Sequence, residues 1–184
     1  MKIVLVSDSH GNTQALAKLG KQFASKACLF IHLGDDSSDA KILSEEGLQV
    51  LKVPGVFETF YTLPEIQVRK LCEYCGKKIL ITHTPHKHSN DLPGLASPEE
   101  LVKNAKADIV LYGHTHIPKI ETDISGVVWI NPGHLKLGDD RGKPMSYAVL
   151  DLTEHKFEAK IYRFEDDSLW MGYSQGKNGQ YNSL

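Results

Sequence analysis

The chain has 184 residues, of which 41% are hydrophobic and 24% are charged, and its formal net charge is −2 at pH 7. This composition is typical of a globular protein with a buried core, and the length favours a single domain. The balanced charge argues against a nucleic-acid partner, because non-specific binding needs clustered lysine and arginine. The first apolar run, residues 3–6, is too short for a signal peptide, and no run is long enough to span a membrane, so we expect a cytoplasmic protein.

Strands and helices alternate in the first part of the chain. Residues 2–7 and 27–33 are near-continuous apolar runs, typical of strands that are buried on both faces. Between these runs, a polar cap residue precedes an amphipathic helix that we expect to end near residue 24. A short helix over residues 39–46 and a third strand over residues 48–53 follow.

The rest of the chain favours antiparallel strands around one helix. The sequence predicts a hairpin over residues 66–81. Ser97-Pro98-Glu99-Glu100 is a typical helix start, with a serine cap, proline at the first helical position and a glutamate three residues after the cap. Further strands are expected over residues 108–112, 119–124, 127–130, 145–152 and 157–164. Alternating units followed by an antiparallel run predict an α/β protein with two packed sheets and helices outside them.

Residues 165–184 are polar, with Trp170, Met171 and Tyr173 among them. This composition favours a loosely docked C-terminal tail, and a clamp onto the domain or onto a partner is the alternative. We therefore expect the folded domain to cover residues 1–164.

Four predicted strands end in loops that carry aspartate or histidine. These loops read Asp8-Ser9-His10, Gly34-Asp35-Asp36, Thr82-His83 and Gly113-His114-Thr115-His116. Ligands of layered α/β folds bind at the carboxyl ends of strands, so the four loops can converge on one point. A single glycine–aspartate turn or a single histidine is commonly structural, but four such loops together favour a binding site.

The side chains in these loops are carboxylates and imidazoles. This combination suits Mn, Fe, Zn, Ni or Co rather than Ca or a thiolate-bound metal, and we expect Mn. In an extended segment, the first and third residues of Asp-x-His and His-x-His point to the same side, so one loop can supply two ligands. Two metal ions a few ångströms apart can bind both oxygens of a phosphate and activate a water. The sequence therefore predicts a metal site that can bind a phosphate group.

As an ordered set, the four loops resemble the motifs of the calcineurin-like metallophosphoesterase superfamily. Asn131-Pro132-Gly133 resembles a further motif of its small bacterial and archaeal phosphodiesterase branch. The resemblance covers residues 1–164 and implies a four-layer α/β/β/α sandwich of two mixed sheets flanked by helices. It also implies a binuclear centre with two divalent transition-metal ions. The implied ligands are Asp8, His10 and His116 for one ion, His83 and His114 for the other, and Asp35 as the bridge.

The chain departs from the family pattern after its third strand. The family has Gly-Asn-His/Cys-Asp/Glu there, in which the asparagine is a metal ligand and the histidine, where present, helps to protonate the leaving group. This sequence has Gly55-Val56-Phe57-Glu58, and neither valine nor phenylalanine can replace those groups. Water or other side chains can take their place. The candidates for a catalytic group are Glu58, His86 and His88, with His134 as a further residue that can face the site.

We therefore predict a metal-dependent phosphodiesterase that hydrolyses a small phosphate ester with a metal-activated water. Without a clear leaving-group acid, it should prefer good leaving groups such as aryl phosphates. Asp36 is expected to hydrogen-bond a metal-bound histidine. One alternative is a catalytically weak or inactive metal-binding scaffold for protein partners, as in a eukaryotic retromer subunit that resembles this family. A single-metal sensor is another alternative, and a homo-oligomer stays open.

Overall fold

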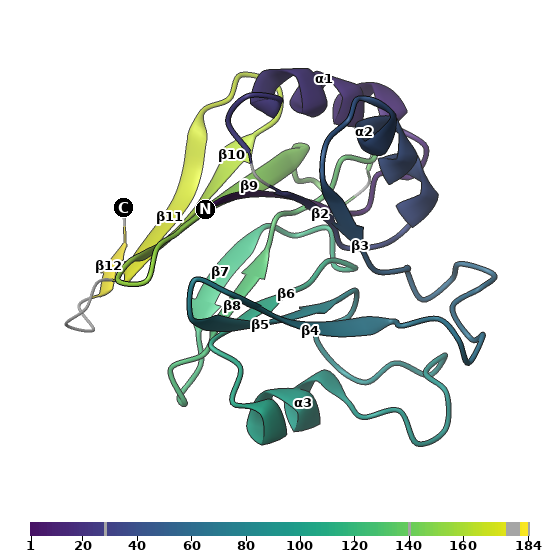
Figure 1. Cartoon of the computed structure of the whole chain (residues 1–184). Helices are drawn as coiled ribbons and strands as arrows, with labels where there is room; N and C mark the ends of the chain where they lie inside the picture. The colour runs from purple at the N-terminus through teal and green to yellow at the C-terminus, as the bar shows by residue number, and fades with distance from the viewer. Residues whose placement is uncertain (28, 140, 176–180, 184) are drawn as a thin grey trace.

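Two β-sheets lie face to face and carry helices on their outer faces (Figure 1). The structure is a computed structural model that describes residues 1–27, 29–139, 141–175 and 181–183. It confirms the predicted four-layer α/β/β/α sandwich of two mixed sheets flanked by helices. The predicted strands are present, with boundaries that differ by up to three residues from those expected.

The first sheet has seven strands in the order β12-β11-β10-β9-β1-β2-β3. Its three N-terminal strands are parallel to one another, and β9 joins them as an antiparallel neighbour of β1. The strands are β1 (Lys2–Val6), β2 (Leu29–His32), β3 (Val50–Lys52), β9 (Ser146–Leu152), β10 (Phe157–Arg163), β11 (Leu169–Gln175) and β12 (Tyr181–Ser183).

The second sheet has five strands in the order β4-β5-β6-β8-β7. Its three central strands are parallel, and an antiparallel strand lies at each edge. The strands are β4 (Arg69–Tyr74), β5 (Lys77–Thr82), β6 (Ile109–Leu111), β7 (Lys119–Thr122) and β8 (Val128–Asn131). The carboxyl ends of β5 and β6 therefore lie at the same edge of this sheet.

The helices cover the two outer faces. On the first sheet lie α1 (Thr13–Phe23) and α2 (Lys41–Glu45), and on the second lies α3 (Pro98–Ala105), which begins with the predicted capping box (Figure 1). The helix expected over residues 39–46 is instead a 3₁₀ turn, η1 (Ser37–Ala40), followed by the short α2. None of the helices in the described part of the chain is long and apolar enough to cross a membrane.

Alternating side chains of the buried strands divide the core into three layers. On β1, Ile3 and Leu5 pack between the two sheets, whereas Val4 and Val6 pack against α1. A third, smaller cluster that includes Val110 lies between the second sheet and α3. Because both faces of β1 are covered, its sequence is apolar without interruption.

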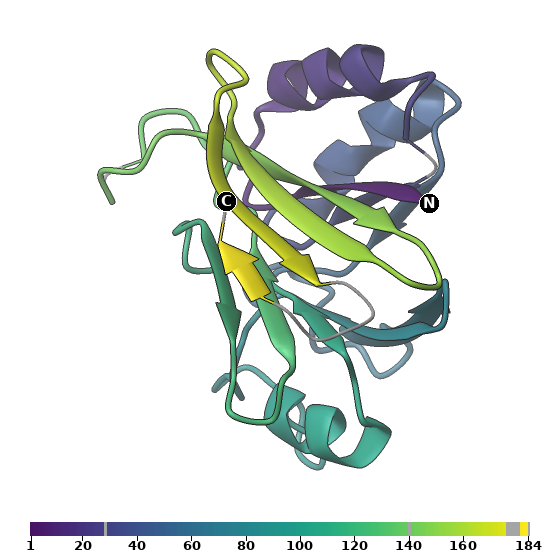
Figure 2. The same ribbon diagram turned by 90° about the vertical axis from the view of Figure 1, so that its left-hand side faces the viewer.

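The segment after residue 164 continues the first sheet (Figure 2). Strand β11 pairs with β10 along its length, and the buried Tyr173 packs with Phe157 in the core between the sheets. The loosely docked tail is therefore the wrong interpretation for residues 169–175, because backbone hydrogen bonds to β10 and β12 hold these residues in the sheet. Residues 176–180 and 184 lie outside the described residues.

Candidate metal centre

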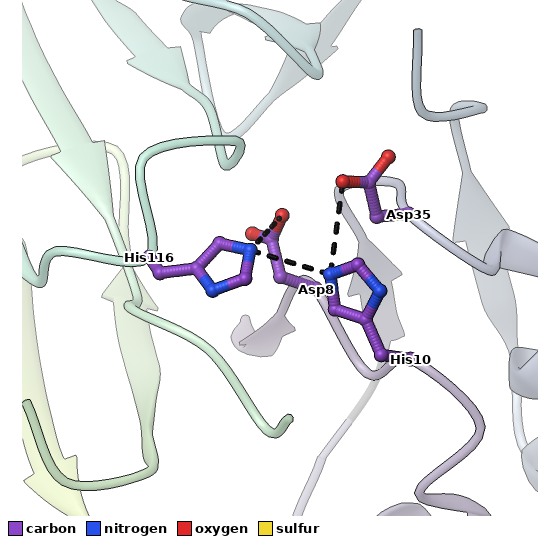
Figure 3. A group of neighbouring side chains, drawn as sticks. All are labelled: Asp8, His10, Asp35 and His116. Atoms are coloured by element: carbon purple, nitrogen blue, oxygen red, sulfur yellow. Dashed lines mark hydrogen bonds and ion pairs between the residues drawn. The ribbon is translucent and has the colours of Figure 1, made fainter. Parts of the chain in front are cut away.

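Side chains from three strand ends face one another at the first part of the site (Figure 3). Asp8 and His10 follow β1, Asp35 follows β2, and His116 follows β6. His10 Nε2 lies 3.3 Å from His116 Nε2 and 3.8 Å from Asp35 Oδ2, and His116 Nε2 lies 3.3 Å from Asp8 Oδ1. These four residues, the first group, each offer a ligand atom within 4.8 Å of the others. The arrangement suits one metal ion.

Asp35 also belongs to a second group, together with His83 after β5 and His114 after β6. Its Oδ1 lies 3.3 Å from His83 Nε2, whereas its Oδ2 faces His10 in the first group. The rings of His83 and His114 lie edge to face at 5.1 Å. The structure thus brings all six predicted ligands together in two groups that share one carboxylate. Their role as metal ligands stays a prediction.

Two buried atoms support a metal in each group. Asp8 Oδ1 and His83 Nε2 make no hydrogen bond of good geometry within the described part of the chain, although each faces an ionisable group at 3.3 Å. A buried polar atom left without a partner costs about 1–3 kcal/mol, so such atoms usually have a reason. One atom belongs to each group, and a divalent cation in that group would satisfy it. The donor set of carboxylates and imidazoles also fits a divalent transition metal.

Neighbouring charges and burial act in opposite directions on the pKa values of the site residues. Burial acts to raise the pKa of Asp35, but His83 at 3.3 Å and the other imidazoles nearby hold this pKa below its ordinary value. Burial acts to lower the pKa values of His83 and His116, but Asp35 raises the first and Asp8 the second above the ordinary value. In His114 burial and His83 prevail and lower the pKa. Carboxylate–imidazolium pairs therefore hold the metal-free site together.

These pKa directions predict that metal binding strengthens as the pH rises. The raised pKa values of His83 and His116 stabilise the metal-free fold below their unfolded value of 6.5, and this contribution is lost as the pH rises through the folded values. A metal ion must also displace these protons, so its affinity grows with pH. Thermal unfolding with and without Mn²⁺ should show a larger gain in Tm at about pH 8 than at about pH 6. A gain that does not change with pH would contradict the assignment.

Five of the six predicted ligands have a left-handed backbone, with φ between 46° and 67°. Non-glycine residues avoid this region at a cost of order 1 kcal/mol, and such strain gathers at functional sites. The residues are Asp8, His10, Asp35, His114 and His116. The extended geometry expected for Asp-x-His and His-x-His is therefore wrong, because tight turns, not extended segments, direct these side chains to the centre.

The loop after β3 borders the centre but turns its valine away. Val56 is buried in a small apolar cluster with Tyr61 and Val68. Phe57 is 71% exposed. Gly55 lies so close to Asp35 that an added Cβ would clash with its carboxylate. The valine therefore anchors the loop, and the glycine allows the close approach to Asp35.

Glu58 is occupied by structural hydrogen bonds. Its carboxylate accepts from the backbone N–H of Gly55 at 2.6 Å and from the N–H and hydroxyl of Ser37 at 3.0 and 2.8 Å. These contacts tie the loop after β3 to η1. Glu58 also lines a cavity of about 150 Å³ beside His10 and Asp35, so it reaches the edge of the centre without replacing the missing asparagine.

The other two catalytic candidates lie on the loop after β5 and differ in position. His86 is largely exposed and pairs with Glu99 at 2.5 Å. His88 packs its ring edge to face against Phe57 at 5.7 Å and against His114 at 5.6 Å. Its Nδ1 accepts from the N–H of Asn90 at 3.1 Å, so the neutral ring carries its proton on Nε2. His88 thus lies beside His114 of the second group and has an N–H on Nε2 that can donate a hydrogen bond.

A buried ion pair holds the loop that carries His88. Asp91 accepts from Arg69 at 2.6 Å, from the Tyr61 hydroxyl at 2.5 Å and from the backbone N–H of His88 at 3.0 Å. The Asn90 side chain donates to the carbonyl oxygen of Val56 at 2.9 Å and joins this loop to the one after β3. The two loops therefore form one unit beside the second group.

Asp139 is a functional candidate that the sequence analysis missed. Its Oδ1 lies 2.7 Å from His116 Nδ1, and its carboxylate is fully buried. A carboxylate on the outer nitrogen of a metal-binding histidine fixes the ring and its tautomer. Asp36 was expected in such a role, but its Oδ2 lies 3.9 Å from His10 Nδ1, too far for a hydrogen bond, so that expectation is wrong. The ring of His134 stacks on the ring of His116, with their centroids 5.2 Å apart.

Replacing Asp139 with asparagine is expected to weaken metal binding to the first group by about 10–100-fold, because His116 loses its orienting carboxylate. Isothermal titration of metal-free protein with Mn²⁺ measures this change. Asp36→Asn is the matched control, since that carboxylate makes no hydrogen bond to a histidine in the described structure. Equal affinities of the two variants would contradict the role of Asp139.

The fold and the paired Asp/His groups define the class of metallophosphoesterases. Residues 1–155 match the calcineurin-like phosphoesterase superfamily domain, and the chain belongs to this superfamily. The "Probable metallophosphoesterase YsnB" of Bacillus subtilis is 29% identical over 168 residues, which cover 91% of this chain and 92% of YsnB. The family match ends before residue 164, so the predicted domain boundary there stays a prediction.

Solved structures of other proteins share the fold. A predicted phosphoesterase of Streptococcus pneumoniae TIGR4 has a TM-score of 0.67 at 20% identity, covering 100% of this chain and 97% of that one. Vps29 of Entamoeba histolytica with Zn²⁺ has a TM-score of 0.66 at 18% identity, covering 97% and 100%. A novel archaeal phosphodiesterase has a TM-score of 0.61 at 24% identity, covering 100% and 99%. At these identities the comparison supports the fold alone.

Proposed function

We propose that the protein is a phosphodiesterase with a binuclear centre that hydrolyses a small phosphate ester. The observation that carries this proposal is the shared Asp35, which offers one oxygen to each group. When bound, two divalent ions, with Mn²⁺ the first choice, supply activation of water and neutralise the charge of the phosphate. Membership of a metallophosphoesterase family and the phosphodiesterase among the structural neighbours support the same reaction.

The protein's own groups hold and orient the ligands. His83 Nδ1 lies 2.7 Å from the carbonyl oxygen of Leu33, so Nδ1 donates there and Nε2 keeps its lone pair for a metal. Asp139 does the same for His116. In the reaction, a water oxygen forms a bond to phosphorus and that water loses a proton to solvent, the bond from phosphorus to the leaving oxygen breaks, and the leaving oxygen takes up a proton from solvent. We assign to His88 the Nε2–H hydrogen bond that stabilises the charge developing on the leaving oxygen.

Replacing His88 with alanine is expected to slow hydrolysis of esters with poor leaving groups by about 100-fold, the lower range for loss of one hydrogen-bond donor to a developing oxyanion. Esters of p-nitrophenol need little help to leave, so their rate should fall only a few-fold. A series of phenyl phosphodiesters with graded leaving groups measures the difference. His86→Ala on the same loop is the control, because its side chain pairs with Glu99. Equal loss across the series would rule out stabilisation of the leaving oxygen by His88.

The test of the function itself is hydrolysis of bis(p-nitrophenyl) phosphate by metal-free protein to which Mn²⁺, Ni²⁺ or Co²⁺ is added. We expect turnover that depends on the metal and disappears in the Asp8→Ala, Asp35→Ala double variant. Turnover no greater than that of the double variant would overturn the proposal.

A metal-binding scaffold for protein partners is the second candidate, favoured by the exposed Phe57 beside the centre. The six predicted metal ligands favour the enzyme, because binding a protein partner does not by itself require them. Lack of turnover in the assay above, with metal bound, would favour the scaffold, and a single bound ion per chain would favour a sensor. A cytoplasmic location and a homo-oligomer stay predictions.

A further inference from the structure

A cavity of about 670 Å³ lies on the outer face of the second sheet. The side chains of β6 and β8 alternate, so that Leu111 and Ile130 pack between the sheets, whereas Tyr112 and Trp129 line this cavity on the other face. Its volume is in the range of small-molecule sites, which extends from about 300 to 1,000 Å³.

Two loops of the candidate metal centre form one end of the cavity. Pro85 and His86, which line it, follow His83 on the loop after β5. Thr115 and Ile117 also line it, and they alternate with His114 and His116 on the loop after β6. The cavity and the centre are thus built from opposite sides of the same two loops. The cavity therefore adjoins the two loops that carry His83, His114 and His116.

The sheet side of the cavity is aromatic and fixed in place. The rings of Tyr112 and Trp129 lie edge to face, with their centroids 6.2 Å apart. Asp123 accepts from the indole N–H of Trp129 at 3.0 Å and so sets the orientation of that ring. Preorganised aromatic faces bind planar rings, such as nucleobases, by stacking.

The polar lining is rich in acceptors and poor in cations. Glu99 and Glu121 supply two carboxylates that pair with His86 and Lys119, and the third carboxylate, Asp123, is occupied by hydrogen bonds from Ser125, Val127 and Trp129. Lys119 pairs with Glu121 at 2.6 Å, but a carboxylate has about four acceptor positions and keeps capacity for another donor. This balance disfavours a second phosphate and favours a neutral group that carries N–H donors.

Tyr112 adds a hydroxyl donor to this lining. Burial and the nearby Glu121 raise the pKa of Tyr112 to about 12, so its hydroxyl stays protonated. Planar rings that present both N–H donors and acceptors match a wall with carboxylates and a phenol. Among common phosphodiester groups, nucleobases with an exocyclic amino group have these properties.

We propose that this cavity binds the base of a nucleoside phosphodiester, with preference for a base that carries an exocyclic amino group. The identification of the bound group as part of a substrate rests on the proposed phosphodiesterase function, but the binding itself does not. Trp129 is the stacking partner, and Glu99 and Glu121 are the acceptors for the amino group.

The binding test uses tryptophan fluorescence. The chain has two tryptophans, so the Trp170→Phe variant leaves Trp129 as the single reporter. Metal-free protein is titrated with cytidine, with uridine, which has a carbonyl in place of the amino group, and with ribose 5-phosphate. We expect a saturable change in emission with cytidine, a weaker one with uridine and none with ribose 5-phosphate. No saturable change with cytidine, or an affinity for uridine or ribose 5-phosphate that equals it, would overturn the proposal.

A kinetic test then joins the cavity to the reaction. The full-length enzyme with Mn²⁺ is given the p-nitrophenyl ester of cytidine monophosphate and methyl p-nitrophenyl phosphate, which lacks the base. In Trp129→Ala the preference for the nucleoside ester, as a ratio of kcat/KM values, should fall about tenfold, in line with loss of one stacking partner. Tyr112→Phe keeps the packing and should also reduce the preference, whereas Leu71→Ala, an exposed side chain on β4, should keep it.

The two tests separate the two proposals. If the wild-type enzyme hydrolyses neither ester, the phosphodiesterase function fails, and the titration still decides whether the cavity binds a base. If both esters are hydrolysed but the ratio is unchanged in Trp129→Ala and Tyr112→Phe, the cavity proposal fails while the function stands.

Discussion

Replacing Asp35 with alanine is expected to reduce bound Mn²⁺ from two ions per chain to at most one and to lower phosphodiester hydrolysis at least about 100-fold. The second group would keep only the two imidazoles of His83 and His114, too few to hold an ion firmly. The first group would keep Asp8, His10 and His116 and bind its ion more weakly. Metal content after dialysis, measured by mass spectrometry beside the hydrolysis rate, checks both parts.

Asp36→Ala is the matched control for this experiment. Asp35 and Asp36 are neighbours with almost the same left-handed backbone, at φ 51° and 57°. Alanine therefore pays the same conformational penalty at both positions, and only the loss at position 35 removes a shared carboxylate. We expect Asp36→Ala to keep two ions and most of its activity. If the two variants lose metal and activity equally, backbone strain rather than ligation explains the result.

The six donors could be predicted from the sequence because each follows the end of a buried strand within five residues. Apolar strands are recognisable from composition alone, and parallel strands bring their carboxyl ends to a common edge. Asp35 shows the limit of a prediction made from strand ends alone. Its position after β2 indicated that it reaches the centre, but the orientation of its two oxygens toward His10 and His83 depends on the left-handed turn that contains it.

The features that could not be predicted depend on tertiary contacts or backbone hydrogen bonds. Asp139 lies 23 residues after His116, in a loop with no periodic pattern, and only packing brings the two together. Val56 looked like a lost ligand, whereas the structure gives it an apolar cluster of its own. Strand β11 lies within a stretch that is polar overall, and pairing with β10 and β12 holds it in the sheet. Sequence patterns report burial along one element, not the partner of a particular side chain.

Replacing Asp91 with alanine is expected to lower the free energy of unfolding by about 3–5 kcal/mol, because Arg69 would be left as a buried charge without its partner. The side chains of Arg69 and Asp91 are only 3% and 0% exposed. For a chain of this length, the loss corresponds to a decrease in Tm of order 10 °C. Thermal unfolding of metal-free protein measures it. Poor leaving groups should also be hydrolysed more slowly, since Asp91 accepts from the backbone of His88.

An ion pair on the surface, with a similar distance between its charged atoms, isolates the effect of burial. Lys2 and Asp151 approach to 2.7 Å, as Arg69 and Asp91 do to 2.6 Å, but their side chains are 32% and 44% exposed. Asp151→Ala should therefore cost less than about 1 kcal/mol. The double change Arg69→Met, Asp91→Leu should recover much of the stability lost in Asp91→Ala, because no buried charge remains. It should not recover hydrolysis of poor leaving groups, since the acceptor that holds the His88 backbone is absent. A double variant as unstable as Asp91→Ala would instead mean that the hydrogen bonds of Asp91, and not the unpaired arginine, set the cost.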